Sequence, residues 1–159
     1  MTLRLIEVLR SIWGAALLAA PRTVLSTIHG VDADRRAVVV TRILGARHLV
    51  QAGLSGLNPS PEVLAAGTWV DGVHSLTAVG LAAVDRHRAR AAVTDAVIAA
   101  TWALFGAHDL SAGHPAPPGR QRRRDRLAQA ILPRLPGGRH VWSMAERQCS
   151  PDISEQIPG

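Results

Sequence analysis

Lysine and tyrosine are absent from this sequence of 159 residues, and cysteine occurs once, at position 149. A single cysteine excludes an intramolecular disulfide and any zinc site built from several cysteines. Because lysine is absent, all 18 residues in the Lys and Arg count are arginine. The chain length leaves room for one domain.

Charge is also scarce. Charged residues make up 19% of the chain and hydrophobic residues 47%, whereas about 25% charge is typical of a soluble domain. The net charge of +6 would ordinarily suggest nucleic acid as a partner. Here the arginines gather in short clusters beside apolar segments, which fits anionic lipid head groups better. We therefore expect membrane lipid as a partner, and nucleic acid is disfavoured.

Four apolar segments dominate the first 110 residues. They are Leu3–Ala20, Ala37–Leu57, Glu62–Val84 and Ala91–Leu110. A helix rises about 1.5 Å per residue, and the hydrocarbon core of a bilayer needs about 20 residues, a length that the last three segments reach. We predict an all-α fold, a four-helix transmembrane bundle over residues 1–110, in a multi-pass protein of the cell membrane.

The first segment leaves three interpretations open. It ends at Pro21 and could span the bilayer or lie along its surface. It could also be a cleaved signal peptide, because Arg4 and Arg10 precede a stretch that ends in Ala-Ala-Pro. Glu7 interrupts the apolar run, which favours a helix that is retained. The Pro-rich turn at 58–61 makes the second and third segments an antiparallel hairpin.

The composition changes at Ser111. Proline and glycine up to residue 119 break regular structure. Residues 120–132 could form a short basic helix on the membrane surface, and we expect the rest of the tail, to residue 159, to be disordered. The tail arginines expected to contact anionic lipid are Arg120, Arg122, Arg123, Arg124 and Arg126.

Polar and ionisable residues inside the apolar segments form the candidate site. A charge at the bilayer centre costs about 2.5 to 3.5 kcal/mol on insertion scales, so it normally faces the bundle and finds a partner there. The predicted network consists of Glu7, Arg10, Arg42, Arg47, His48, Gln51, Asp71, His74 and Asp95.

Depth along each helix, counted from the arginine-rich connectors, sorts the charged members of this network into two layers. Near the connectors we expect Arg42 to meet Asp95. The layer near the midplane contains Glu7, Arg10, Arg47, Asp71 and His74. Arg10 and Arg47 are expected to find their acidic partners there.

The network has two interpretations. Buried salt bridges could fix the order and register of the helices. Alternatively, the polar layer could be a proton or ion relay, or a site for a small polar substrate. A hydrolase triad is disfavoured because His74 and Ser75 point about 100° apart on a helix. A metal site of His48, Asp71 and His74 is disfavoured by the neighbouring charge of Arg47. We predict no catalytic residue, metal or cofactor.

The run Arg42-Ile43-Leu44-Gly45-Ala46-Arg47 has the pattern R-x-L-G-x-R. Together with Asp71 and four apolar segments, it resembles small four-helix membrane proteins of actinobacteria that are loosely similar to DoxX-like families. The resemblance covers about residues 5–110. It implies a four-span bundle with Arg42, Arg47 and Asp71 as motif residues, and the DoxX-like link implies a redox accessory role. The predicted spans contain no cysteine for thiol chemistry.

These observations predict a non-enzymatic accessory or interaction protein of the membrane, with a membrane-protein partner or a second copy of the chain. The alternative is a small proton-coupled transporter or a membrane-embedded redox enzyme. A third interpretation is a soluble helical protein. Arginine in the connectors at 21–36 and 85–90 favours that end as the cytoplasmic one.

Overall fold

The computed structural model describes residues 5–56, 59–112 and 123–149, and all regular elements in these ranges are helical. The elements are α1 (Leu5–Ala19), α2 (Pro21–Val24), the π-helix η1 (Leu25–His29), α3 (Arg35–Ser55), α4 (Pro61–Val84), α5 (Ala89–Ser111), α6 (Arg123–Ile131), the 3-10 helix η2 (Leu132–Arg134) and α7 (Gly138–Cys149). The all-α prediction is confirmed. The four predicted apolar segments coincide with α1, α3, α4 and α5 to within one turn.

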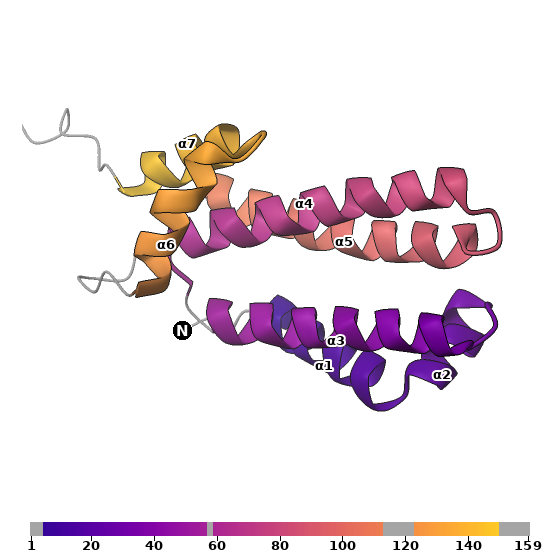
Figure 1. Ribbon diagram of the computed structural model, residues 1–159. Coiled ribbons are helices and arrows are strands. Elements are labelled where there is room, and N and C mark those ends of the chain that lie inside the picture. The colour runs from indigo at the N-terminus through magenta and orange to yellow at the C-terminus, as the bar shows by residue number, and fades with distance from the viewer. Residues whose placement is uncertain (1–4, 57–58, 113–122, 150–159) are drawn as a thin grey trace, which may run out of the picture.

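The four long helices form two antiparallel pairs, α1 with α3 and α4 with α5 (Figure 1). Glycine lets the helices of the first pair approach closely. A Cβ atom at Gly45 would lie 2.7 Å from the carbonyl oxygen of Gly14, closer than real contacts allow. In the second pair a Cβ atom at Gly106 would collide with the hydroxyl of Thr68. Packing between the two pairs is much sparser than packing within them.

Local capping interactions set where the long helices begin and end. The side chain of Asp34 accepts a hydrogen bond of 2.6 Å from the Ala37 N–H and so starts α3. Gly56 ends α3 with a φ of 62°, a left-handed value that glycine adopts without strain. Ser60 caps α4, and Pro61 occupies its first turn, where a missing N–H costs nothing. These caps fix the depth of every site residue on α3 and α4.

Residues 123–149 form a helical cap, consisting of α6, η2 and α7, on one end of the α4–α5 pair (Figure 1). Its apolar core is Ala65, Leu110, Leu132 and Ala145, with Leu64, Trp69, Leu135, Val141, Trp142 and Met144 packed against it. The indole N–H of Trp69 also donates to the carbonyl of Pro136 at 2.8 Å. We call this unit the C-terminal cap.

The prediction of a disordered tail is therefore wrong for residues 133–149. The basic helix expected at 120–132 exists as α6, but the chain continues into η2 and α7. A segment as polar as residues 123–149 cannot bury enough apolar surface to fold by itself. Here one end of the α4–α5 pair supplies apolar side chains for it to pack against. The remaining tail residues, 113–122 and 150–159, lie outside the described ranges.

One helix among the described residues, α5, is both long and apolar enough to span a membrane, and only 22% of that stretch is buried in the structure. A core helix of a soluble protein would be mostly buried. The helix α1 together with Pro21–His29 meets the same criteria only as one span bent by 103°. Helices α3 and α4, with 21 and 24 residues, are long enough but do not meet the criteria for apolar composition.

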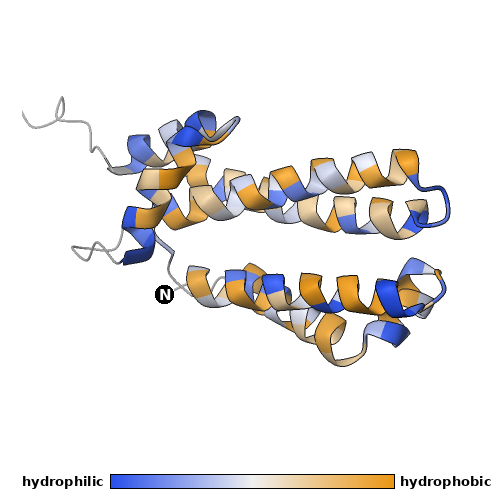
Figure 2. Ribbon diagram, in the orientation of Figure 1, coloured by the Kyte–Doolittle hydropathy of each residue, from blue (hydrophilic) through white to orange (hydrophobic). Residues whose placement is uncertain are grey.

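Large hydrophobic residues lie on the outside of all four long helices. Figure 2 shows apolar residues along both pairs, with hydrophilic residues gathered at the α4–α5 turn, at the start of α3 and in the C-terminal cap. Strongly exposed examples are Ile12 (61%), Ile43 (63%), Leu76 (73%) and Leu104 (71%). We call the exposed Leu, Ile and Val residues of α1, α3, α4 and α5 the apolar exterior.

Candidate functional site

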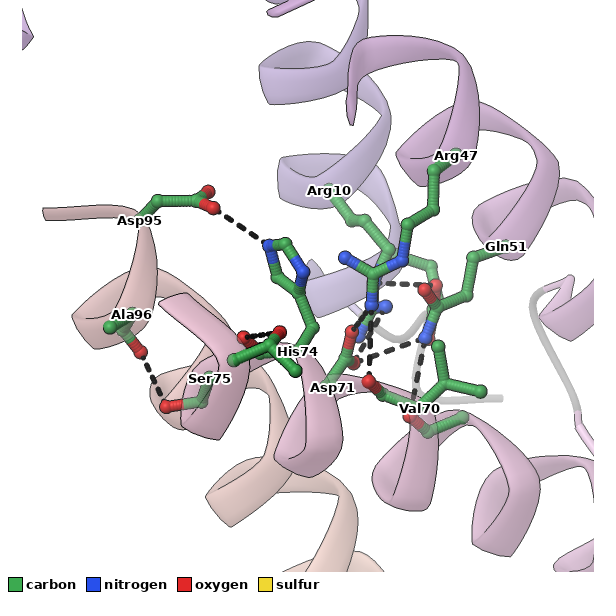
Figure 3. A network of polar contacts seen from close by, with 12 residues as sticks. Arg10, Arg47, Gln51, Val70, Asp71, His74, Ser75, Asp95 and Ala96 are labelled. Carbon is green, nitrogen blue, oxygen red and sulfur yellow. Dashed lines mark hydrogen bonds and ion pairs between the residues drawn. The ribbon is translucent and has the colours of Figure 1, made fainter. Parts of the chain in front are cut away.

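Asp71 on α4 is fully buried and lies at the centre of a group of ionic contacts between the two helix pairs (Figure 3). Its Oδ2 atom lies 2.8 Å from Nη1 of Arg10 on α1. Its Oδ1 atom accepts a hydrogen bond of 2.9 Å from Nη2 of Arg47 on α3. Gln51, one turn further along α3, donates to Oδ2 at 3.0 Å. One carboxylate therefore binds side chains from both helices of the other pair.

Arg10 also has partners on its own helix and on α5. Its Nε atom lies 3.6 Å from a carboxylate oxygen of Glu7, and both side chains are buried. Its guanidinium carbon lies 5.3 Å from the ring centroid of Trp102, a cation–π distance. We call Glu7, Arg10, Arg47, Gln51 and Asp71 the Asp71 cluster. Its two arginines and two carboxylates balance, so its formal charge is zero.

The two α3 residues of the cluster also bind the backbone of α4. Arg47 donates to the carbonyl of Val70 at 3.4 Å, and Gln51 donates to that of Gly67 at 3.3 Å. Residues four apart share one face of a helix, so this face of α3 is turned toward α4. The same contacts fix the register of α3 against α4.

A small pocket, with room for about one water molecule, adjoins the Asp71 cluster. It is lined by Arg10, Gln51 and Asp71 on its polar side and by Leu64 and Trp102 among others. The side-chain oxygen of Gln51 and the indole N–H of Trp102 are buried and have no hydrogen-bond partner in the described ranges. The interior next to Asp71 therefore keeps unused hydrogen-bonding capacity.

A second polar contact lies within the α4–α5 pair. His74 Nε2 on α4 lies 2.7 Å from Asp95 Oδ2 on α5, and both side chains are partly exposed (Figure 3). One residue further along α4, the Ser75 hydroxyl donates to the carbonyl of Ala96 at 2.9 Å. The structure thus places His74 against Asp95, although the sequence placed it in the layer of Asp71.

The predicted pairing of Arg42 with Asp95 is not found. Arg42 is exposed and makes no hydrogen bond or ion pair with any residue that the structure describes. Arg42 precedes Arg47 by five residues, which turns it about 140° around the helix axis. Depth along the helix therefore predicts the partner of Arg47, whereas the position of Arg42 around the helix axis leaves it exposed.

His48 lies apart from the ionic contacts. It is almost completely buried where α3 crosses α1 at Gly14, and neither ring nitrogen has a hydrogen-bond partner among the described residues. In these ranges no three His, Cys, Asp or Glu side chains are arranged to hold a metal ion. The structure therefore gives His48 a packing role between α1 and α3.

Trp102 is the contact that the sequence interpretation missed. It follows Asp95 by seven residues, so both lie on the same face of α5, and Gly106 continues that face. This spacing was a usable signal, because an aromatic ring on the polar face of a helix is a natural partner for a buried guanidinium.

Comparison with known proteins adds no relative, since no family model, curated protein or solved structure matches this chain. The resemblance to DoxX-like proteins stays a prediction from the R-x-L-G-x-R pattern. In the structure, Gly45 of that pattern makes the helix crossing and Arg47 the ion pair, while Arg42 points outward.

Proposed function

We propose that this protein is a multi-pass integral membrane protein in which α1, α3, α4 and α5 lie in the bilayer, and that it acts as a non-enzymatic accessory or interaction protein. The observation that supports this most strongly is the inverted distribution of side chains. Asp71 and Arg10 are buried, whereas Ile43, Leu76 and Leu104 are largely exposed.

The apolar exterior would be costly in water. Exposed apolar surface costs about 25 cal/mol per Å², and monomeric soluble proteins rarely expose large contiguous apolar patches. In a bilayer the same surface meets lipid tails at no such cost. Charges near the bilayer centre must then turn inward and pair with one another, as Arg10, Arg47 and Asp71 do. The exposed Arg42 lies two turns from the start of α3, where a long side chain can extend to the head groups. One environment thus accounts for both features.

The chemistry of the Asp71 cluster favours a structural role. Arginine does not give up its proton in proteins, so Arg10 and Arg47 are unsuited to carry protons. The cluster is formally neutral, and its contacts join both helices of one pair to α4. We assign it the task of holding the two pairs in one register, a recognised use of buried polar groups. The apolar exterior is then free to bind a membrane-protein partner or a second copy.

Membrane fractionation tests this proposal. After washing of membranes with alkaline carbonate, which strips peripheral proteins, we expect the chain to stay in the pellet and to be released only by detergent. Release without detergent would contradict membrane insertion. Purification in mild detergent should then yield a stoichiometric partner or a dimer, and a monomer with no partner would reject the accessory role.

A second candidate function is a proton relay, and the observation that favours it is the contact of His74 with Asp95. Imidazole is the side chain best suited to exchange protons at physiological pH. The side chains of His74 and Asp95, which join α4 to α5, are both partly exposed. Proton flux through liposomes that contain the protein should then be lost in His74→Gln and Asp95→Asn variants. Liposomes that are as tight as protein-free ones would exclude the relay.

A further inference from the structure

We infer that the outward face of α6 binds the head-group layer of an anionic membrane. This face consists of Arg123, Arg126, Leu127 and Ile131, and we call it the α6 stripe. The inference rests on the proposed insertion of the bundle in a membrane. The inference assigns a lipid-binding surface to the C-terminal cap, and insertion of the four long helices does not by itself require such a surface.

The inward face of α6 is fixed by contacts with the start of α4. The hydroxyl of Ser60 donates to Asp125 Oδ1 at 2.7 Å, and the Gln129 amide donates to Glu62 at 3.2 Å. Ala128 is buried on the same side. Because these contacts hold α6 from one side, the opposite side of this helix is presented to its surroundings in a defined orientation.

The α6 stripe combines apolar and cationic side chains. Leu127 and Ile131 are 60% and 50% exposed, lie one turn apart and are the two large apolar residues of α6. Arg123 lies one turn before Leu127, and Arg126 directly precedes Leu127 in the sequence. Neither arginine forms an ion pair or hydrogen bond with a residue that the structure describes. Apolar residues flanked by free arginine are typical of helices that lie in a membrane interface.

Arg124 differs from its neighbours, although the sequence grouped it with them as a lipid contact. Its guanidinium donates to the carbonyls of Leu54 and Ser55, in the last turn of α3. These carbonyls lack helical partners and carry the negative end of the helix dipole, so a cation is well placed there. Arg124 therefore ties the C-terminal cap to α3. Arg120 and Arg122 lie outside the described residues.

The position of α6 indicates lipid as the occupant of the stripe. α6 crosses the N-terminal end of α4, at one end of the two helix pairs (Figure 1). In a bilayer this end lies at the level of the head groups. Their phosphates supply the anions that Arg123 and Arg126 do not find among the described residues, while the acyl region below accepts Leu127 and Ile131.

Site-directed fluorescence tests the inference. In a Cys149→Ser background, Leu127→Cys and Ile131→Cys variants are labelled with an environment-sensitive dye and reconstituted in vesicles of phosphatidylcholine and phosphatidylglycerol. We expect blue-shifted emission that spin-labelled lipid quenches most strongly near the head groups. Emission typical of water, with no quenching, would overturn the inference. Shielding that depends on protein concentration and not on lipid would overturn it in favour of a protein partner.

Labels on the bundle separate this result from the proposed function. Ile43→Cys and Leu104→Cys, in the same background, report insertion of α3 and α5. If these labels are quenched by lipid and those on α6 are not, the inference fails and the membrane bundle stands. If none is quenched, both fail.

The arginines are tested by lipid charge. Omission of phosphatidylglycerol should reduce the blue shift at Leu127→Cys, and a combined Arg123→Gln and Arg126→Gln change should remove that dependence on lipid charge. The matched control is Arg147→Gln, an exposed arginine on α7 outside the stripe, which should leave it unchanged. If Arg147→Gln reduced the dependence on lipid charge equally, the effect would come from net charge, and specific binding by the α6 stripe would be contradicted.

Discussion

Where α1 and α3 meet α4, the side chains in contact include arginine, glutamine and aspartate, whereas the C-terminal cap meets α4 and α5 through alanine, leucine and tryptophan. Apolar side chains gain free energy by packing together only when the alternative is contact with water. Within a bilayer, lipid tails compete equally well for an apolar helix face, so polar pairing and close packing must select the partner helix. The polar contacts between the helix pairs thus fit the proposed position inside the bilayer, and the apolar core of the C-terminal cap fits a position outside it.

The largest effect is expected from Asp71→Asn, which leaves the partly buried Arg47 without a counter-ion and the buried Arg10 with Glu7 alone. Breaking a buried pair in this way typically costs about 3 to 5 kcal/mol. Unfolding in mild detergent should report this loss, and the two helix pairs should separate first. The control Glu146→Gln removes an exposed carboxylate of α7 and should change little. Equal stability of the two variants would refute the role of the Asp71 cluster.

Leu132→Ala should weaken the other region. Leu132 is 2% exposed in the core of the C-terminal cap, and truncation of a buried leucine costs about 2 to 5 kcal/mol. We expect faster trypsin cleavage at Arg139 and Arg147 while the contacts of Asp71 persist. Leu127→Ala, an exposed leucine on α6, is the matched control. If both variants were cleaved at the wild-type rate, the cap would not depend on this core.

Gly45→Ala tests the close crossing of α1 and α3. The added methyl group would lie 2.7 Å from the Gly14 carbonyl oxygen, so the helices must move apart. Overpacking of this kind costs about 1 to 3 kcal/mol. Gly53→Ala on the same helix is the control, since no atom lies within 4 Å of its added methyl group. A smaller loss in Gly45→Ala than in Gly53→Ala would contradict the crossing.

The smallest effect concerns pH at the arginine-rich end. The Ala37 N–H and the charge of Arg88 lower the pKa of Asp34 from its ordinary 3.8, and the side-chain hydrogen bond from Arg88 lowers the pKa of Asp85. A lowered pKa in the folded state gives stability that is present above the ordinary pKa and is lost as pH falls through the lowered one. Carboxyl-carbon NMR titration should show both low midpoints, and Arg88→Gln should raise them. Unchanged midpoints would argue against this contact.

The sequence predicted the long helices well, because their apolar segments are bounded by strong signals such as Pro21, Ser60 and the arginine cluster at 85–90. Depth along the helices also placed Arg10 and Arg47 at the level of Asp71, where the structure brings them together. These features depend on the chain locally, and 1.5 Å per residue is enough to locate them.

Other features depend on tertiary contacts that the sequence does not display. The rotation of α3 leaves Arg42 exposed, and that rotation depends on the packing of Gly45 against α1 and on the contacts of Arg47 and Gln51 with α4. The C-terminal cap becomes helical because Leu132 and Trp142 find an apolar surface on α4 and α5. Its own composition gives no sign of that surface.

A photoreactive lipid incorporated in the bilayer, with the labelled residues mapped by mass spectrometry, tests most directly whether the apolar exterior meets lipid and the Asp71 cluster is shielded from it. We predict labels on Ile43, Leu76 and Leu104 and none on Asp71, Arg10 or Arg47. Labels on the charged residues, or an apolar exterior that no lipid reaches, would contradict this prediction.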